Sequence, residues 1–205
     1  MLAKDLLLFH VLPRTYRKAA KAPVEPGKVI FLDNKEPQLP ESFEVLYERL
    51  GRVPSLTLEF MSLGETRVRL RQYYRNCIVF VKKLATAQCV FLNDASNVVS
   101  CVPLRPETTV VQLWHACGAF KQWGMSTADL IFGGSREDIL RHPFYKNLSL
   151  VTVSSPEVAW AYEEAMVLQD EPGVVRPVGV SRTDVFFDEG YLVESRRKLL
   201  EMVPA

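Results

Sequence analysis

The residues with the clearest chemical potential stand in "VVQLWHACGAFKQWG" (110–124), where an apolar run leads into Trp114 and His115. An imidazole with an ordinary pKa of about 6.5 accepts a proton from a hydroxyl at neutral pH. A half-buried His115 at the end of a strand is therefore a candidate general base. The alternative is a core histidine with only structural hydrogen bonds, and position alone leaves both interpretations open.

The neighbouring candidates carry weaker signals. Cys117 has the chemistry of a nucleophile. However, a cysteine only two positions from a histidine rarely has the geometry that a catalytic pair requires, so the spacing favours a small packed residue. Lys121 either contacts a phosphate or lies solvated in its loop. In "RPVGVSRTDVFFD" (176–188), Arg182 and Asp184 follow a strand and a glycine. They either face the same rim as His115 or pair with each other to fix a turn.

Missing motifs exclude several functional classes. The sequence has no G-x-G-x-x-G, no G-x-x-x-x-G-K-[ST] and no G-x-S-x-G, which argues against dinucleotide dehydrogenases, P-loop NTPases and α/β-hydrolases. The four cysteines lack zinc or disulfide spacing, as in a reduced cytoplasmic protein. A net charge of +1 provides no overall electrostatic attraction for nucleic acid. The basic stretch "RVRLRQYYR" has the spacing of a helix in an otherwise neutral protein, which argues against a nucleic-acid site. We expect no metal, no cofactor and no nucleic-acid partner.

The elements that position these residues alternate between short apolar runs and helical patterns. Strands are predicted at 28–33, 56–61, 88–94, 109–115, 148–155 and 175–180, and helices at 40–50, 65–87, 154–166 and 191–202. The near-continuous hydrophobicity of the strands is typical of a parallel sheet that is covered on both faces. The pattern predicts an α/β fold with a Rossmann-like, doubly wound, mainly parallel sheet.

Ligands of such sheets bind beyond the carboxyl ends of the strands. His115, Asn93-Asp94 and Ser154-Ser155 all fall at predicted carboxyl ends. The segment from 116 to 147 is the longest gap in the pattern and is rich in glycine and aromatic residues. A loop of this length in a compact domain is usually functional, so the sequence places the site at this edge of the sheet.

The two ends of the chain are predicted to flank the sheet domain, 28–190. Residues 1–27 form an amphipathic, basic segment, and 191–205 form a helix that leads towards a second domain. An apolar run (6–12) precedes the basic residues Arg14, Arg17, Lys18 and Lys21, an order opposite to that of a signal peptide. The segment either packs on its own domain with a solvated basic end or rests on an anionic membrane surface.

Three stretches together resemble the CDP-glycerol glycerophosphotransferases, the teichoic-acid polymerases and primases. They are "VVQLWHACGAFKQWGMS", the preceding "LATAQCVFLNDASNVVS…LRPET" and "GVSRTDVFFD". The family's hallmarks are a W-H-G-type segment after a central strand, a lysine soon after it, and a later G-x-P-R-x-D turn. The resemblance covers roughly residues 28 to 203. It implies one half, the N-terminal acceptor-side half, of a GT-B architecture.

The resemblance implies transfer of glycerol phosphate from CDP-glycerol to a hydroxyl of a lipid-linked glycerol-phosphate or glycan acceptor, with release of CMP. His115 would be the general base, and Lys121 and Gly118 would lie in the adjoining substrate-binding loop. Arg182 and Asp184 would shape the rim of the cleft. The implied location is cytoplasmic, peripheral at the inner face of the cell membrane.

Three departures from the family pattern matter. Ala116-Cys117-Gly118 replaces the usual G-T-P, so Cys117 inherits no role, and Ser181 replaces a proline, which should make the turn less rigid. The half that binds most of the CDP-glycerol is missing, so we expect the chain to be inactive alone. The alternatives are half of a GT-B glycosyltransferase that uses a sugar nucleotide, and a non-catalytic remnant that binds a polymer or partner.

Overall fold

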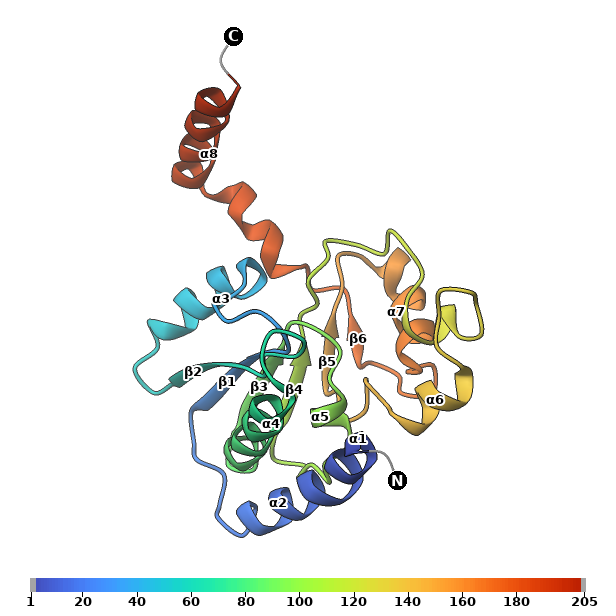
Figure 1. Cartoon of the computed structure of the whole chain (residues 1–205). Coiled ribbons are helices and arrows are strands. Elements are labelled where there is room, and N and C mark those ends of the chain that lie inside the picture. The colour runs from blue at the N-terminus through green and yellow to red at the C-terminus, as the bar shows by residue number, and fades with distance from the viewer. Residues whose placement is uncertain (1–2, 204–205) are drawn as a thin grey trace.

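The apolar runs of the sequence form one parallel sheet. A computed structural model of the chain describes residues 3–203. Its strands are β1 (Lys28–Asp33), β2 (Thr57–Ser62), β3 (Cys89–Leu92), β4 (Thr109–Gln112), β5 (Leu150–Thr152) and β6 (Val175–Arg176). Their order is β2-β1-β3-β4-β5-β6, and every neighbouring pair is parallel (Figure 1). The predicted α/β class with a parallel, doubly wound sheet is confirmed.

Helices connect the strands in the alternation that the sequence predicts. They are α1 (Ala3–Leu6), the π-helix η1 (Leu7–Val11), α2 (Leu12–Ala19), α3 (Glu41–Gly51), α4 (Leu70–Leu84), α5 (Asn97–Ser100), the 3-10 helix η2 (Gly124–Thr127), α6 (Arg136–Arg141), the 3-10 helix η3 (Pro156–Val158), α7 (Ala159–Met166), the 3-10 helix η4 (Ser181–Phe187) and α8 (Glu189–Met202). The predicted helix at 65–87 begins later, at Leu70. Gly64 and Thr66 take positive φ values of 69° and 62°, and form a turn instead.

The alternation of side chains along β1 divides the core between the two faces of the sheet. Ile30 and Leu32 join the larger cluster, which α2, α4 and α7 cover. Phe31 points the other way and packs edge-on against Phe43 of α3, with ring centroids 5.0 Å apart. Burial on both faces explains why the strands read as nearly unbroken apolar runs.

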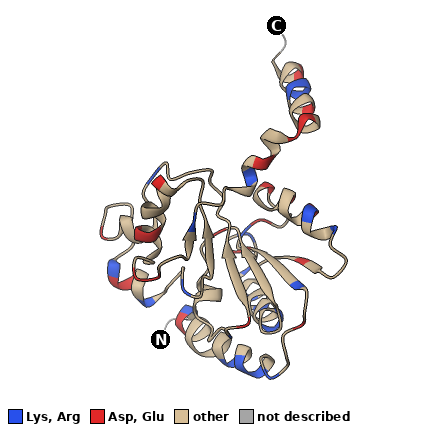
Figure 2. Cartoon of the chain, turned by 180° about the vertical axis from the view of Figure 1, so that it is seen from behind, with Lys and Arg blue, Asp and Glu red and all other residues tan. Residues whose placement is uncertain are grey.

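The N-terminal helices belong to this same core. Leu8, Leu12 and Tyr16 are buried within the larger cluster, and the Tyr16 hydroxyl accepts a hydrogen bond from the backbone N–H of Arg105 at 3.0 Å. The basic residues of α2 (Arg14, Arg17 and Lys18) are exposed instead, and Figure 2 marks basic positions along this helix. Of the two interpretations of this segment, packing on its own domain therefore describes residues 3–20.

A buried carboxylate holds α1 to the C-terminal end of α6. The Asp5 side chain accepts hydrogen bonds from Arg141 at 2.7 Å and from the His142 ring at 2.9 Å. Phe9 stacks on His142, with ring centroids 5.5 Å apart. The hydrogen bond from His142 and the charge of Arg141 lower the pKa of Asp5 below its ordinary value.

Replacing Asp5 by asparagine should flatten the acid limb of the stability curve. A carboxyl group whose pKa is lower in the folded state stabilises the fold above its unfolded pKa, and this contribution is lost as the pH falls through the folded value. We expect the free energy of unfolding of the wild type to decrease as the pH drops below about 4. The Asp5→Asn variant should lose less of its free energy of unfolding over the same pH range. Urea denaturation between pH 3 and pH 7 measures both curves. Parallel acid limbs would contradict the prediction.

The last helix, α8, stands away from the sheet (Figure 1). Within the described part of the chain it has no buried residue, and Leu199, Leu200 and Met202 are exposed. Arg197 forms ion pairs with Glu194 and Glu201 along its polar side. The amphipathic pattern that the sequence shows at 191–202 is present, and its apolar side is solvent-exposed in this structure.

Candidate functional site at the sheet's switch point

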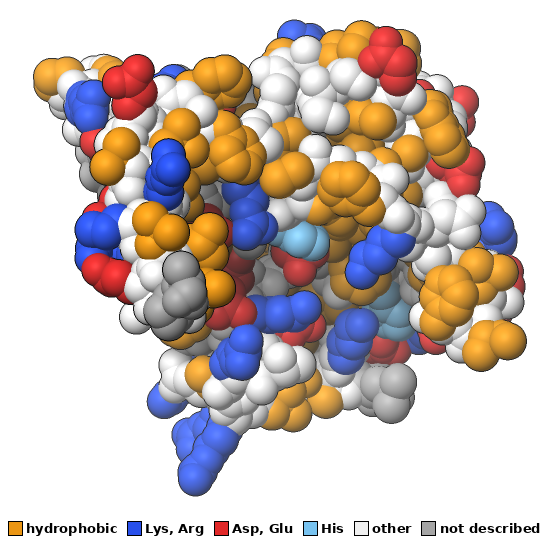
Figure 3. All heavy atoms as spheres, turned by 90° about the horizontal axis from the view of Figure 1, so that it is seen from above, with side chains coloured by type: hydrophobic (Ala, Val, Ile, Leu, Met, Phe, Trp, Pro, Cys, Tyr) orange, Lys and Arg blue, Asp and Glu red, His pale blue; other side chains and the backbone are white. Residues whose placement is uncertain are grey.

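The strand order reverses between β1 and β3, and the candidate site lies at the carboxyl ends of these strands. Crossovers leave a sheet in opposite directions at such a point, which opens a crevice where ligands of doubly wound sheets bind. Asp33 ends β1, and Asn93 follows directly after β3. Figure 3 views the molecule from the side on which α8 leaves it and shows a hollow edged by basic and histidine side chains.

A buried polar network forms the floor of this crevice. The Asp33 carboxylate accepts hydrogen bonds from the backbone N–H groups of Lys35 and Glu36, both at 2.7 Å. Its other oxygen accepts from the side-chain amide of Asn93 at 2.5 Å. The Ser42 hydroxyl donates to the amide oxygen of Asn93, so α3 is joined to the same network. The side chains of Asp33, Asn93 and Ser42 are all paired within this network, which makes the floor rigid.

His115 stands on this floor. Its Nδ1 lies 3.3 Å from the backbone carbonyl oxygen of Asn93. With the proton on Nδ1, this nitrogen donates to the carbonyl, and the lone pair of Nε2 stays free to accept a proton. The side chain is exposed and not half-buried as expected, because β4 ends at Gln112 and the chain turns outward before His115. The arrangement suits a general base that meets substrate from solution.

Trp114 provides the turn that presents His115. Its φ is +64°, a left-handed conformation that costs roughly 1 to 2 kcal/mol for a residue with a Cβ. The indole is nevertheless buried, and the His115 ring stacks on it with centroids 4.6 Å apart. Trp123 and Tyr162 pack beside it, with centroid distances of 5.5 Å and 6.4 Å from Trp114. Strain of this kind is concentrated at functional sites.

Arg182 holds the backbone of His115 from the opposite side. Its guanidinium donates to the carbonyl oxygen of His115 at 2.9 Å and to the Glu41 carboxylate at 2.6 Å. Asp184 faces Arg49 of α3 at 3.8 Å. Arg182 and Asp184 therefore do not pair with each other, and both join η4 to α3. Their predicted part in shaping the rim of the cleft stays a prediction, and this geometry is compatible with it.

Ser181 contributes a bond that a proline at this position would lack. Its hydroxyl donates to the backbone carbonyl of Ser42 at 2.6 Å. The sequence departure was expected to loosen this turn. The hydrogen bond ties the turn to the start of α3 instead, beneath the Arg182 contact.

The loop after His115 lines a pocket of about 210 Å³ beside it. Gly118 and Lys121 line this pocket together with the rings of Phe120 and Trp123. Lys121 is exposed, so its ammonium group is available to an anionic ligand. Cys117 is exposed and lies outside the pocket lining. The structure thus brings three predicted site residues together, His115, Gly118 and Lys121, and leaves Cys117 aside.

Sequence reasoning missed the groups that support His115. Asp33 was visible only as the last residue of a strand, and Ser42 only as a residue in a helix. The one signal that could have found them is the switch point itself, which requires the strand order. Within residues 3–203, no group of three His, Cys, Asp or Glu side chains lies close enough together to hold a metal ion.

Comparisons with known proteins identify the family to which this chain is similar. A family model described as CDP-Glycerol:Poly(glycerophosphate) glycerophosphotransferase matches residues 14–200. A teichoic acid ribitol-phosphate primase of Bacillus spizizenii is 32% identical over 176 residues, which are 85% of this chain and 45% of that protein. A teichoic acid ribitol-phosphate polymerase of Staphylococcus aureus is 29% identical over 86% of this chain and 33% of its own length.

The fold has a solved counterpart as well. A structure of the wall teichoic acid polymerase TagF matches with a TM-score of 0.66 at 13% identity, over 98% of this chain and 52% of that one. This likeness concerns the fold alone. The chain spans about half the length of that structure and less than half of the two curated relatives. Since the family model matches most of its length, the chain belongs to the CDP-glycerol:poly(glycerophosphate) glycerophosphotransferase family.

Proposed function

We propose that the protein containing this chain transfers glycerol phosphate from CDP-glycerol to a hydroxyl of a lipid-linked acceptor during teichoic acid synthesis. Family membership supports the reaction class. The observation that carries the role of this chain is His115, exposed at the switch point with Nδ1 facing the Asn93 carbonyl. This chain would be the acceptor-side half.

In the proposed reaction, Nε2 of His115 takes the proton of the acceptor hydroxyl. The oxygen then forms a bond to the phosphorus that carries glycerol, the P–O bond to the other phosphate breaks, and CMP leaves. Such transfers are accelerated by positioning and by charge complementarity. Lys121 is the cation of this chain that lines the His115 pocket, and Gly118 lines the same pocket. The donor would be held mainly by parts of the protein beyond this chain.

A ribitol-phosphate donor is the second candidate. It is favoured by the names of the curated relatives, which are ribitol-phosphate primases and polymerases. Ribitol has two more hydroxymethylene carbons than glycerol. In each donor the polyol is attached to the corresponding phosphate, the one farther from cytidine. The chemistry at His115 is therefore identical for both donors, and the choice between them depends on the donor pocket.

A donor screen tests the proposal. The whole protein would be incubated with a lipid-linked acceptor and either CDP-glycerol, CDP-ribitol or a nucleotide sugar, and released nucleotide would be measured. CMP from CDP-glycerol supports the proposal, and CMP from CDP-ribitol alone supports the second candidate. Turnover of the nucleotide sugar alone would replace both with a glycosyltransferase. Absence of release from every donor would indicate a non-catalytic binding protein.

We also propose that the protein lies at the inner face of the membrane, where a lipid-linked acceptor is available. Among the described residues, no helix combines the length and the apolar character needed to pass through a bilayer. Attachment would instead use the exposed basic residues at the N-terminal end, Arg14, Arg17, Lys18 and Lys21. Each basic residue near an anionic surface contributes about 1 kcal/mol.

Changing these four basic residues to glutamate should reduce binding to vesicles that contain phosphatidylglycerol by at least about a hundredfold. Co-sedimentation at low salt measures it. Deleting the segment would remove Leu12 and Tyr16 from the core, so charge reversal is the cleaner change. A matched control reverses four exposed basic residues elsewhere, Arg52, Arg176, Arg196 and Lys198. Equal loss in both variants would refute a specific basic surface.

A further inference from the structure

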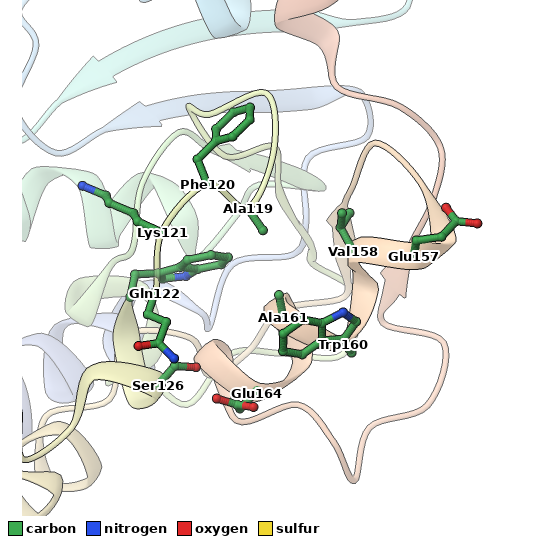
Figure 4. Close-up of a pocket in the computed structure, with 11 residues that line it drawn as sticks. Ala119, Phe120, Lys121, Gln122, Ser126, Glu157, Val158, Trp160, Ala161 and Glu164 are labelled. Carbon is green, nitrogen blue, oxygen red and sulfur yellow. The ribbon is translucent and has the colours of Figure 1, made fainter.

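A second pocket adjoins the His115 pocket and has no part in the proposed chemistry. Its volume is about 380 Å³, within the size range of small-ligand sites. Phe120, Lys121 and Trp123 line both pockets, so the two share a wall. Figure 4 shows that the loop after His115 supplies one side of the second pocket and that α7 supplies the other.

The apolar part of this pocket is an aromatic surface exposed to solvent. Trp160 of α7 is 65% exposed, although tryptophan is a residue that folding usually buries. Phe120 is 86% exposed on the facing loop. An exposed indole in a pocket offers a flat apolar face, with little conformational entropy to lose when a ligand covers it.

The polar part gathers at one end of the pocket. The amide of Gln122, the hydroxyl of Ser126 and the carboxylate of Glu164 all belong to the pocket lining, and Figure 4 shows them along the lower edge of the pocket. None of these three side chains has a hydrogen-bond partner among residues 3–203, whereas the hydroxyl of the next residue, Thr127, donates to the Gly124 carbonyl at 2.9 Å. They supply donors and acceptors that are free to meet a ligand.

The spacing of these groups is set by a close backbone contact. Gly124 has a φ of +56°, and a Cβ at this position would lie 2.3 Å from the carbonyl oxygen of Ala165. Glycine therefore allows the loop to rest directly against α7. The contact places Ser126, on one side of the pocket, opposite Glu164 on the other.

The charges select the kind of ligand. Two carboxylates, Glu157 and Glu164, line the pocket on the α7 side. The one cation among its lining residues, Lys121, also lines the His115 pocket, and in Figure 4 it extends away from Trp160. A phosphate at Trp160 would meet like charge, while hydroxyl groups can donate to the carboxylate of Glu164. The pocket therefore suits an uncharged ligand rich in hydroxyls.

We propose that this pocket binds a neutral sugar residue of the acceptor, stacked on Trp160 with its hydroxyls on Gln122, Ser126 and Glu164. The inference rests on the proposed function, since a sugar held here would direct the adjoining part of the acceptor towards His115. A ring with one apolar face and hydroxyls at its edge matches an indole beside a polar cluster. A repeating polyol phosphate, with a negative charge on each unit, matches it poorly.

Titration of the 205-residue chain tests the proposal. The probe is the disaccharide of N-acetylglucosamine, followed by saturation-transfer NMR and by tryptophan fluorescence. We expect Trp160→Ala to weaken binding at least about fivefold, Trp160→Phe to restore most of it, and Glu164→Gln to weaken it. Unchanged thermal unfolding would show that Trp160→Ala retains the fold, as an exposed position predicts.

Three results would overturn the proposal. They are no binding of the sugar, equal binding by wild type and Trp160→Ala, or displacement of the sugar from Trp160 by equimolar glycerol 3-phosphate. The His115→Ala variant should bind the sugar as the wild type does. If it binds sugar normally and the whole protein shows no transferase activity, the proposed function fails and the sugar site stands. If the whole protein turns over normally and the chain binds no sugar, the sugar site fails and the proposed function stands.

Discussion

Replacing His115 by alanine in the whole protein should lower the turnover rate by at least a factor of about 10², the usual contribution of a general base. The acceptor hydroxyl would then lose its proton to water. Because His115 is exposed and the floor beneath it is formed by Asp33, Asn93 and Ser42, the fold should be unchanged. Release of CMP from the preferred donor measures the rate, and circular dichroism confirms the fold.

The matched control is Cys117→Ala, two positions along the same loop. Cys117 is exposed and lies outside the lining of both pockets, so the rate should stay within about twofold of wild type, or about 0.4 kcal/mol. A loss of less than about tenfold for His115→Ala, equivalent to about 1.4 kcal/mol, would show that His115 is not the base. A large loss for Cys117→Ala would reassign the chemistry to the thiol.

Replacing Trp114 by alanine should destabilise the fold by about 3 to 5 kcal/mol, the usual effect of removing a buried aromatic ring. The indole is only 7% exposed and packs against Trp123, Tyr162 and the His115 ring. Alanine retains a Cβ, so the cost of the positive φ remains while the packing is lost. Urea denaturation of the 205-residue chain measures the change.

Trp160→Ala is the control for this stability effect. It removes the same ring from an exposed position, so the free energy of unfolding should change by no more than about 0.5 kcal/mol. Similar losses in the two variants would mean that the cluster around Trp114 is not the packed unit that the structure shows. Comparing the two variants distinguishes the structural role of Trp114, which packs against His115, from the role of Trp160, which lines the second pocket.

The sheet was predictable because its signal is local. Each buried strand is an apolar run, and the alternation with helices determines that the strands are parallel. The placement of His115 at the carboxyl end of its strand followed from the same pattern, although the predicted strand, 109–115, included His115 and β4 ends at Gln112. The exposure of His115 did not, because it depends on a left-handed tryptophan, and residue type alone rarely indicates that conformation.

The contacts of Arg182 show that pairs between residues far apart in the sequence could not be predicted. Spacing in the sequence suggested a pair with Asp184, two positions away. The partner is Glu41, 141 positions earlier in the chain, and it comes close only when η4 packs against α3. The polar end of the second pocket was hidden for a related reason. Trp160 and Glu164 read as ordinary positions of a surface helix until the loop at Gly124 lies against it.

The contact between Tyr16 and Arg105 has a consequence for synthesis of the protein. The two residues are 89 positions apart, and at ribosomal rates of about 5 to 20 residues per second the second emerges roughly 5 to 20 s after the first. During that interval only β1, β2 and β3 are made, so the sheet beneath η1 and α2 is still incomplete. Helix α4, which also packs on α2, emerges in the same period. The apolar side of the nascent N-terminal segment thus stays uncovered until these later elements have been made.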